Sequence, residues 1–323
     1  MRQHRIFTSL LALIAGLSLA CGASHPGNGA SSSGSGQSST PGSAAAGSVT
    51  AQVASSEIVL GPNRFVLGLL DSSGVPIPDA TAHLTFYDLS SAQALTKGEA
   101  DAVFRAPARE AGLAETISIT LPNGQKKVQT NAPSDVGVYD AQFAFDKVGN
   151  WGVQAQGKLK NGTPYTARAG FVVKEKGETP AIGSPAPPSR NLTAKDVSDI
   201  AQIDTSVYPS PDMHTESIAD GLAAGHVLLV LFASPGYCTS RFCGPELELA
   251  RKLEPQYKGR VDFIHVEIYK DPAQRLPVDA VNEWHLPSEP WFFIVDAKGN
   301  VRAKFEGPTG TKELQDAINL VAG

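Results

Sequence analysis

The chain has 323 residues, of which 41% are hydrophobic and 18% charged, and its formal net charge at pH 7 is −5. This composition is typical of a globular protein, and the length allows two ordinary domains once a targeting segment is set aside. Lysine and arginine are scattered and form no basic stripe interleaved with aromatic residues. We therefore expect no nucleic-acid partner.

The first twenty residues have the pattern of a secretory signal peptide. Arg2 and Arg5 precede an apolar run from Ile6 to Ala20, which is too short to be read as a settled transmembrane span. Cysteine directly after Ala20 resembles the lipobox of bacterial lipoproteins, although Ser18 stands where that pattern usually has leucine. The resemblance implies a signal peptide over residues 1–20, lipid on Cys21 and an anchor on the extracytoplasmic side of the cell membrane. A plain signal peptide with an unmodified Cys21 is the alternative.

Residues 21–54 are expected to be a tether. Most of this stretch consists of Gly, Ser, Ala, Pro, Asn and Gln. Such a segment cannot bury enough apolar surface to offset its chain entropy, so we expect it to be flexible.

Residues 55–176 show the period-two alternation of β-strands. In the run from Ala82 to Tyr87 every second residue is apolar, and Asn123-Gly124 and Asn161-Gly162 each lie between strand-like runs, as in two-residue hairpins. About seven short strands predict an all-β antiparallel sandwich with Trp151 in its core. This half of the chain resembles the Ig-like modules of bacterial surface lipoproteins.

Residues 177–195 are rich in Pro and Gly and predict a linker between domains. After it, residues 196–323 alternate between strand and helix patterns. The expected elements are a buried strand at 226–233, a helix at 245–257, a strand at 261–268, a short helix at 279–284, two strands at 291–296 and 301–305, and a helix at 311–321. A β-α-β unit followed by a hairpin and a helix is the order of the thioredoxin fold.

The C-terminal region also resembles the extracytoplasmic branch of the thioredoxin superfamily in its motifs. An apolar strand runs into "SPGYCTSRFC", and "LPSEPWFFIVDAKGNVRAKFEG" follows later. The resemblance covers about residues 206–323 and implies an α/β thioredoxin-like fold with redox chemistry. It also implies a cis-proline at Pro290, facing the cysteines and shaping a substrate groove.

The cysteine spacing departs from that family. Thioredoxins have two residues between their cysteines, whereas Cys238 and Cys243 have four, and Gly244-Pro245 follows the second. A similar spacing occurs in peroxiredoxins that resolve within one helix, but the residues before their reactive cysteine are not in register here. Pro290 favours the thioredoxin resemblance.

Helix geometry restricts how the two cysteines can form a bond. Residues five apart in a regular helix have Cα atoms about 8 to 9 Å apart, whereas a disulfide needs them within roughly 7 Å. Either the residues before Cys243 form a loop leading into a helix, or the bond forms by unwinding a turn. Pro245 favours the loop, because proline fits the first turn of a helix.

Several residues are candidates for the chemistry. A helix N-terminus and Arg241 would both favour a thiolate; we expect Cys238 to attack and Cys243 to resolve, with the reverse order still open. Glu289, Pro290 and Trp291 are predicted to support a substrate groove, although Trp291 could equally pack in the core. His265 and Glu267 share one face of a strand and could shuttle protons, but we interpret them as a polar patch on a partly exposed strand. His214 joining the cysteines around copper is a weaker hypothesis, and we expect no metal or other cofactor.

Two functions follow from this pattern. The first is a membrane-anchored thiol–disulfide oxidoreductase, a monomer whose partners are exported protein thiols or disulfides, or a membrane redox partner. The second is a non-catalytic surface module in which the Cys238–Cys243 bond is structural and the sandwich binds a partner. A copper chaperone is a third and weaker possibility.

Overall fold

A computed structural model of the chain describes residues 48–121 and 123–322. The predicted signal peptide, the predicted lipidation site Cys21 and most of the predicted tether lie outside the described residues. None of the described helices is both long and apolar enough to cross a membrane.

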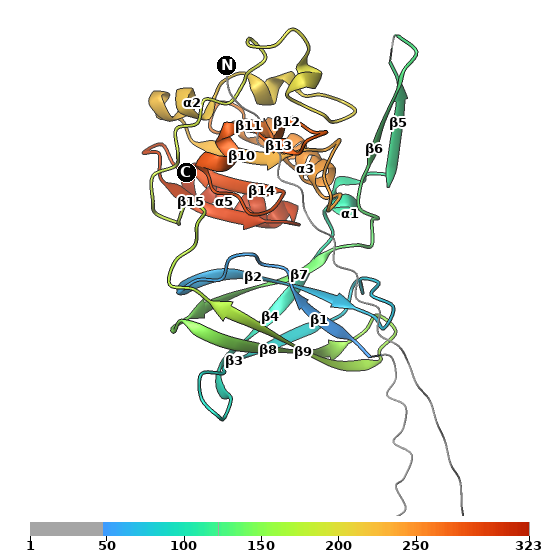
Figure 1. The fold of residues 1–323 in the computed structure, drawn as a ribbon, viewed down its shortest axis with the longest axis vertical. Helices are drawn as coiled ribbons and strands as arrows, with labels where there is room; N and C mark the ends of the chain where they lie inside the picture. The colour runs from blue at the N-terminus through green and yellow to red at the C-terminus, as the bar shows by residue number, and fades with distance from the viewer. Residues whose placement is uncertain (1–47, 122, 323) are drawn as a thin grey trace, which may run out of the picture. The chain divides into compact units, whose positions relative to one another are not determined.

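The N-terminal half is an antiparallel β-sandwich, as predicted (Figure 1). Its strands are β1 (Thr50–Val53), β2 (Gly61–Leu70), β3 (Ala82–Asp88), β4 (Leu95–Arg105), β7 (Val138–Phe145), β8 (Gly149–Lys158) and β9 (Pro164–Val173). Their order is β1-β2-β7-β4-β3-β8-β9. Most of β4 pairs with β3, but its last three residues pair with β7, so this strand joins the two layers.

The core of the sandwich is aromatic. Phe65, Phe86, Phe145 and Trp151 are each at most 2% exposed, and Trp151 contacts Phe145 edge to face with ring centroids 5.0 Å apart. The predicted core position of Trp151 is therefore confirmed. Such edge-to-face pairs add about 0.5–1.5 kcal/mol to the burial of the rings themselves.

The expected start of the sandwich at residue 55 is too late. Strand β1 begins at Thr50 and pairs with the end of β2. Ala51 is 7% exposed and belongs to the sandwich core. The sequence did not predict this strand, because one buried alanine in a Gly- and Ser-rich stretch is a weak indication of a β-strand.

A long insertion connects β4 to β7. It holds α1 (Pro107–Ala111) and the hairpin of β5 (Thr116–Thr120) and β6 (Lys126–Thr130), which Figure 1 shows as a separate two-stranded arm. The hairpin turn lies at Asn123-Gly124, as predicted, and Gly124 has a φ of 81°. This left-handed conformation is one that glycine adopts without steric cost.

The predicted linker is not a free spacer. The amides of Gly183 and Ala186 donate hydrogen bonds to the carbonyls of Val301 and Gly299, at 2.7 and 2.8 Å. Ala186 is buried in the core of the C-terminal region. The segment therefore packs against the β15 side of that region, because its unpaired backbone groups find partners there.

The C-terminal region is a mixed α/β unit with the predicted order of a β-α-β unit, a hairpin and a final helix. Its elements are η1 (Ile200–Gln202), η2 (Pro211–His214), α2 (Ile218–Ala224), β10 (Leu228–Ala233), α3 (Cys243–Tyr257), β11 (Asp262–Glu267), β12 (Tyr269–Asp271), β13 (Leu276–Pro277), α4 (Asp279–Glu283), β14 (Trp291–Val295), β15 (Val301–Glu306) and α5 (Thr311–Ala322). The central sheet has the order β11-β10-β14-β15, with β10 parallel to β11 and antiparallel to β14. The turns η1 and η2, α2 and the β12/β13 pair were not predicted.

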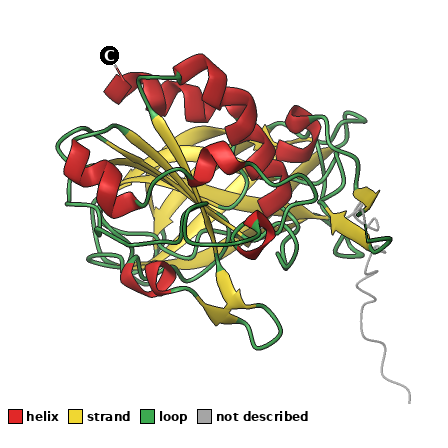
Figure 2. Cartoon of the chain, turned by 90° about the horizontal axis from the view of Figure 1, so that it is seen from above, coloured by secondary structure: helices red, strands yellow, loops and turns green. Residues whose placement is uncertain are grey.

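Helices cover both faces of this sheet, which Figure 2 shows in red against yellow strands. Leu231 of β10 shares a core with Leu253 of α3 and Ile318 of α5, whereas Val230 shares one with Ile218 of α2 and Ala280 of α4. This two-sided cover explains why β10 is apolar at every position rather than at every second one.

Candidate active site

The two cysteines are held by the loop between β10 and α3. β10 ends at Ala233 and α3 begins at Cys243, so Cys238 lies in the loop and its disulfide partner is the first residue of the helix. The Cα atoms are 6.0 Å apart, within the range that a disulfide needs. The loop arrangement favoured by Pro245 is therefore the one found.

The loop reverses direction at Arg241. This residue has a φ of 63°, in the left-handed region, and its amide approaches the carbonyl of Cys238 at 3.4 Å. Its carbonyl accepts a hydrogen bond from the amide of Ala132 in the β4–β7 insertion. The side chain is exposed, and no hydrogen bond or ion pair of its guanidinium occurs among the described residues. The structure thus gives Arg241 a backbone role and shows no contact between its charge and the sulfurs.

The two sulfurs lie in different environments. Cys243 is fully buried in the core between α3 and the sheet, whereas Cys238 is half-buried at its margin. The amide of Cys243 donates to Sγ of Cys238 at 3.3 Å, and Oγ of Ser240 lies 3.3 Å from the same sulfur. Because the first amides of a helix have no partner inside the helix and carry its positive end, they favour negative charge on Cys238.

The loop before β14 completes the site. The peptide bond between Glu289 and Pro290 is cis, as the resemblance implied. The carboxylate of Glu289 accepts a hydrogen bond from the amide of Thr239 at 3.1 Å. The backbone carbonyl oxygen of Glu289 lies 3.4 Å from Oγ of Ser240. One carboxylate oxygen of Glu289 and both sulfurs lie within 4.8 Å of one another. The structure therefore brings together Cys238, Cys243, Glu289 and Pro290.

Glu289 has the properties of a proton-transfer group. Burial raises the pKa of its carboxyl above the ordinary value, and the hydrogen bond from Thr239 opposes this increase only in part. Its second oxygen, Oε2, is buried and has no hydrogen-bond partner within residues 48–121 and 123–322. A carboxyl whose pKa is raised toward that of a thiol is better suited to exchange a proton with a thiol beside it.

The predicted groove residue Trp291 lies in the core. It is 2% exposed, stacks on Phe293 and belongs to the core, so it does not line an open groove.

Arg275 contacts the cysteine loop, although it was not predicted. It donates a hydrogen bond to Oγ1 of Thr239 at 3.0 Å and lies over the ring of Tyr269. The sequence did not single out Arg275 or Tyr269, because neither belongs to a motif and their position depends on the β12/β13 turn.

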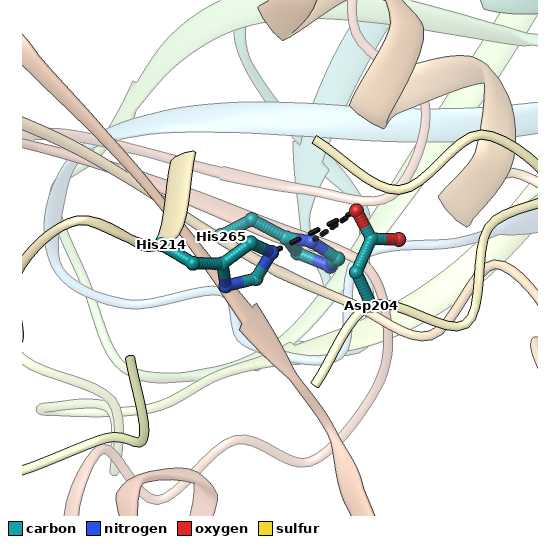
Figure 3. A group of neighbouring side chains, drawn as sticks. All are labelled: Asp204, His214 and His265. Carbon is teal, nitrogen blue, oxygen red and sulfur yellow. Dashed lines mark ion pairs between the residues drawn. The ribbon is translucent and has the colours of Figure 1, made fainter. Parts of the chain in front are cut away.

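A second polar cluster lies inside the fold, where three side chains come close to one another (Figure 3). It consists of Asp204, His214 and His265, which are at most 1% exposed. Oδ2 of Asp204 lies 3.7 Å from Nε2 of His214 and 3.9 Å from Nδ1 of His265. His214 thus meets Asp204 and His265 rather than the cysteines, which removes the geometric basis for copper held by His214 and the cysteine pair.

The interpretation of His265 and Glu267 as partly exposed was wrong. Both are buried, at 0% and 5% exposure, because the segment containing η2 packs across β11. Burial lowers the pKa of His265 to about 4 and raises that of Glu267 to about 7. Burial opposes ionisation of Asp204 too, but His214, His265 and hydrogen bonds outweigh it and hold its pKa below the ordinary value.

Comparison with known proteins gives only distant matches. No family model and no curated protein matches this chain. A putative thiol:disulfide interchange protein DsbE from Chlorobium tepidum matches with 13% identity and a TM-score of 0.33, covering 45% of this chain and 100% of that one. A thioredoxin-family thiol:disulfide interchange protein from Chlorobium tepidum TLS matches with 16% identity and a TM-score of 0.32, covering 44% and 99%.

A cohesin module from a Clostridium perfringens family 33 glycoside hydrolase matches with 12% identity and a TM-score of 0.20, covering 40% of this chain and 98% of that module. At such identities a likeness concerns the fold alone. The chemistry of this chain therefore has to come from its own site.

Proposed function

We propose that the protein is a thiol–disulfide oxidoreductase that uses Cys238 and Cys243. The observation that carries this proposal is the hydrogen bond from the amide of Cys243, at the start of a 15-residue helix, to Sγ of Cys238. A thiolate is the nucleophile in thiol–disulfide exchange, and a helix N-terminus lowers the pKa of a neighbouring thiol. Cys238 is also the more accessible of the two sulfurs, so we assign it the attacking role.

The reaction follows from these positions. In the reduced protein the Cys238 thiolate attacks one sulfur of a substrate disulfide R–S–S–R′, which forms a mixed disulfide and releases R′S⁻. The Cys243 thiol then loses its proton and attacks Sγ of Cys238, which releases RS⁻ and closes the Cys238–Cys243 bond. Two electrons pass from the protein to the substrate, and the two released thiolates take up protons.

Glu289 is placed to accept the proton of the resolving thiol. Its carboxylate lies within 4.8 Å of both sulfurs and is anchored to the loop by the amide of Thr239. The buried Cys243 has little access to water, so an internal acceptor is needed when it is deprotonated. In the reverse reaction the Cys238–Cys243 bond is reduced to two thiols, and the same carboxyl returns the proton to Cys243.

A redox titration tests the proposal. The fraction of labelled thiols, measured in glutathione buffers, should give a reduction potential between about −120 and −270 mV, the range of exchange catalysts. The wild type should reduce a small disulfide substrate, Cys238→Ser should be inactive, and Cys243→Ser should accumulate the mixed disulfide. Glu254→Gln, on the same helix but outside the site, is the matched control and should keep wild-type activity.

We also propose a place and a partner class for this activity. The order of signal-peptide pattern, Cys21 and Gly/Ser-rich segment supports a protein attached to the membrane by lipid on Cys21. Exported protein disulfides or a membrane redox partner would then be its substrates. Fractionation of cells that produce Cys21→Ser tests this, because the variant should move from the membrane fraction to the soluble fraction.

The alternative function is a surface module with a structural disulfide. The complete burial of Cys243 favours it, since a resolving cysteine must be reached by a reductant or by its own partner. A potential below about −300 mV would support this alternative and exclude the oxidoreductase, because such bonds resist physiological thiols.

A further inference from the structure

We propose that Asp204, His214 and His265 form a binding site for a divalent transition-metal cation of the zinc type. The three side chains come from the segment after η1, from η2 and from β11, and they converge inside the fold (Figure 3). The site is separate from the disulfide and does not depend on the proposed redox function.

The distances between the donor atoms support a shared ion. Oδ2 of Asp204 is 3.7 Å from Nε2 of His214 and 3.9 Å from Nδ1 of His265. These separations are too long for a hydrogen bond, which needs about 2.7–3.2 Å. Two ligands bound at about 2.1 Å with an angle of 110–130° between them are about 3.4–3.8 Å apart. The Asp204–His214 separation of 3.7 Å lies in this range and the Asp204–His265 separation of 3.9 Å slightly exceeds it, so small shifts of the side chains would bring the three donor atoms around one ion.

The hydrogen bonding of the histidines also supports a bound cation. Nε2 of His265 donates to the carbonyl of Ala233 at 3.0 Å, so in the neutral ring the lone pair is on Nδ1, which faces the carboxylate. A metal-binding histidine commonly donates its other N–H to a backbone carbonyl. Neither ring nitrogen of His214 has a hydrogen-bond partner among the described residues. The lone pair of Nδ1 of His265 therefore faces Oδ2 of Asp204, and a cation between them would bind both; the same oxygen also accepts a hydrogen bond from the amide of Ser210 at 2.8 Å.

The charges around the cluster permit a cation. Glu267 lies two residues from His265 on the same strand, and its Oε1 is buried without a hydrogen-bond partner in the part of the chain that the structure describes. Arg251 brings one positive charge, with Nη2 3.4 Å from Oδ2 of Asp204, but the same nitrogen also donates to Oγ of Ser206 and the carbonyl of Tyr208. Asp204 and Arg251 balance each other in charge, so the immediate surroundings carry no net positive charge against a cation.

The donor set identifies the class of ion. Two imidazole nitrogens and one carboxylate oxygen are ligands that zinc accepts in a tetrahedral site. Calcium and magnesium require more oxygen ligands, and monovalent copper prefers sulfur. Because the ligands are fully buried and come from three segments, the bound ion would fasten the segment over β11 to the sheet.

The experiment uses the full oxidised chain, so that the cysteines cannot bind metal as thiolates. The protein is unfolded in guanidinium chloride with a chelator, freed of both, and refolded with zinc chloride or without metal. We expect one zinc per chain after gel filtration. The dissociation constant for zinc should be at least about 100-fold higher in His214→Gln and in His265→Gln, because even the loss of a residue that hydrogen-bonds to a metal ligand changes metal affinity by about 10–100-fold.

Two controls separate this site from others. The group of Glu216, His226 and Asp262 has the same kinds of donors but only His226 is exposed and the other two are half-buried, so His226→Gln should bind zinc as the wild type does. The Cys238→Ser/Cys243→Ser double variant should also bind it. Absence of zinc in the refolded wild type, zinc that persists in both buried-histidine variants, or zinc that disappears in either control would overturn the proposal.

A measurement on the wild type covers the case in which the histidine variants do not fold. X-ray absorption at the zinc edge should show imidazole nitrogen and oxygen ligands in fourfold coordination. Sulfur ligands, or a sixfold oxygen shell typical of surface binding, would overturn the assignment.

Discussion

Substitution of Glu246 by glutamine should change the pH dependence of stability. Glu246 lies in the first turn of α3, is fully buried, and its carboxyl accepts hydrogen bonds from the amide and hydroxyl of Thr309. Burial raises its pKa from 4.5 to about 8, against the opposing effects of Thr309 and Arg64. The folded protein therefore keeps this proton up to about pH 8, whereas the unfolded chain releases it near pH 4.5.

The sign and size of the effect follow directly. Between about pH 4.5 and 8 the folded state binds more protons, so the free energy of unfolding falls as pH rises. At about 1.4 kcal/mol for each pH unit, the full loss is on the order of 5 kcal/mol at pH 9. Glu246→Gln keeps the shape and both hydrogen-bond partners but cannot ionise. Its free energy of unfolding should match the wild type at pH 4 and exceed it by several kcal/mol at pH 9.

Urea unfolding between pH 4 and 9, followed by tryptophan fluorescence in a Trp151→Phe background, measures this difference in the C-terminal region. Glu254→Gln, on the same helix, should leave the pH dependence as in the wild type. A difference between Glu246→Gln and the wild type that stays constant from pH 4 to 9 would refute the reasoning.

Four further predictions concern the site and its core. Cys238→Ser should abolish alkylation by iodoacetamide at pH 6, whereas Cys243→Ser should retain it, as measured by mass spectrometry. Glu289→Gln should slow resolution of the mixed disulfide by about 100-fold in stopped-flow measurements, with little effect on its formation. Trp291→Ala should lower the free energy of unfolding by about 3–5 kcal/mol, because it empties a core position. Arg241→Gly should keep both activity and stability, since glycine accepts the left-handed conformation, while a rise of one unit in the pKa of Cys238 would instead show that the guanidinium matters.

The local patterns predicted most of the fold. The uniformly apolar β10 indicated a strand covered on both faces, and the Cα distance required by a disulfide, together with Pro245, favoured a helix that begins near Cys243. The cis bond at Pro290 came from the family resemblance, which is specific at that position. These signals are local or belong to a motif, so they can be recognised in a single sequence.

The buried histidine cluster could not be predicted in the same way. The alternation in β11 placed His265 and Glu267 on one face but did not show what covers that face. The cover is the segment from Asp204 to His214, which has no apolar periodicity and was not assigned to any element. Which residues meet across an edge strand depends on the path of such a segment, and composition does not encode that path.

The four-residue spacer between the cysteines is explained by where α3 begins. If the helix began at Cys238, Cys243 would lie more than a turn further along, and the two Cα atoms would be too far apart to bond. The helix begins instead at Cys243, and the left-handed turn at Arg241 brings the chain back, so that the first helical amide reaches Sγ of Cys238. The wider spacing therefore keeps the contact between Sγ of Cys238 and the N-terminus of α3, and that contact is what thiolate chemistry requires.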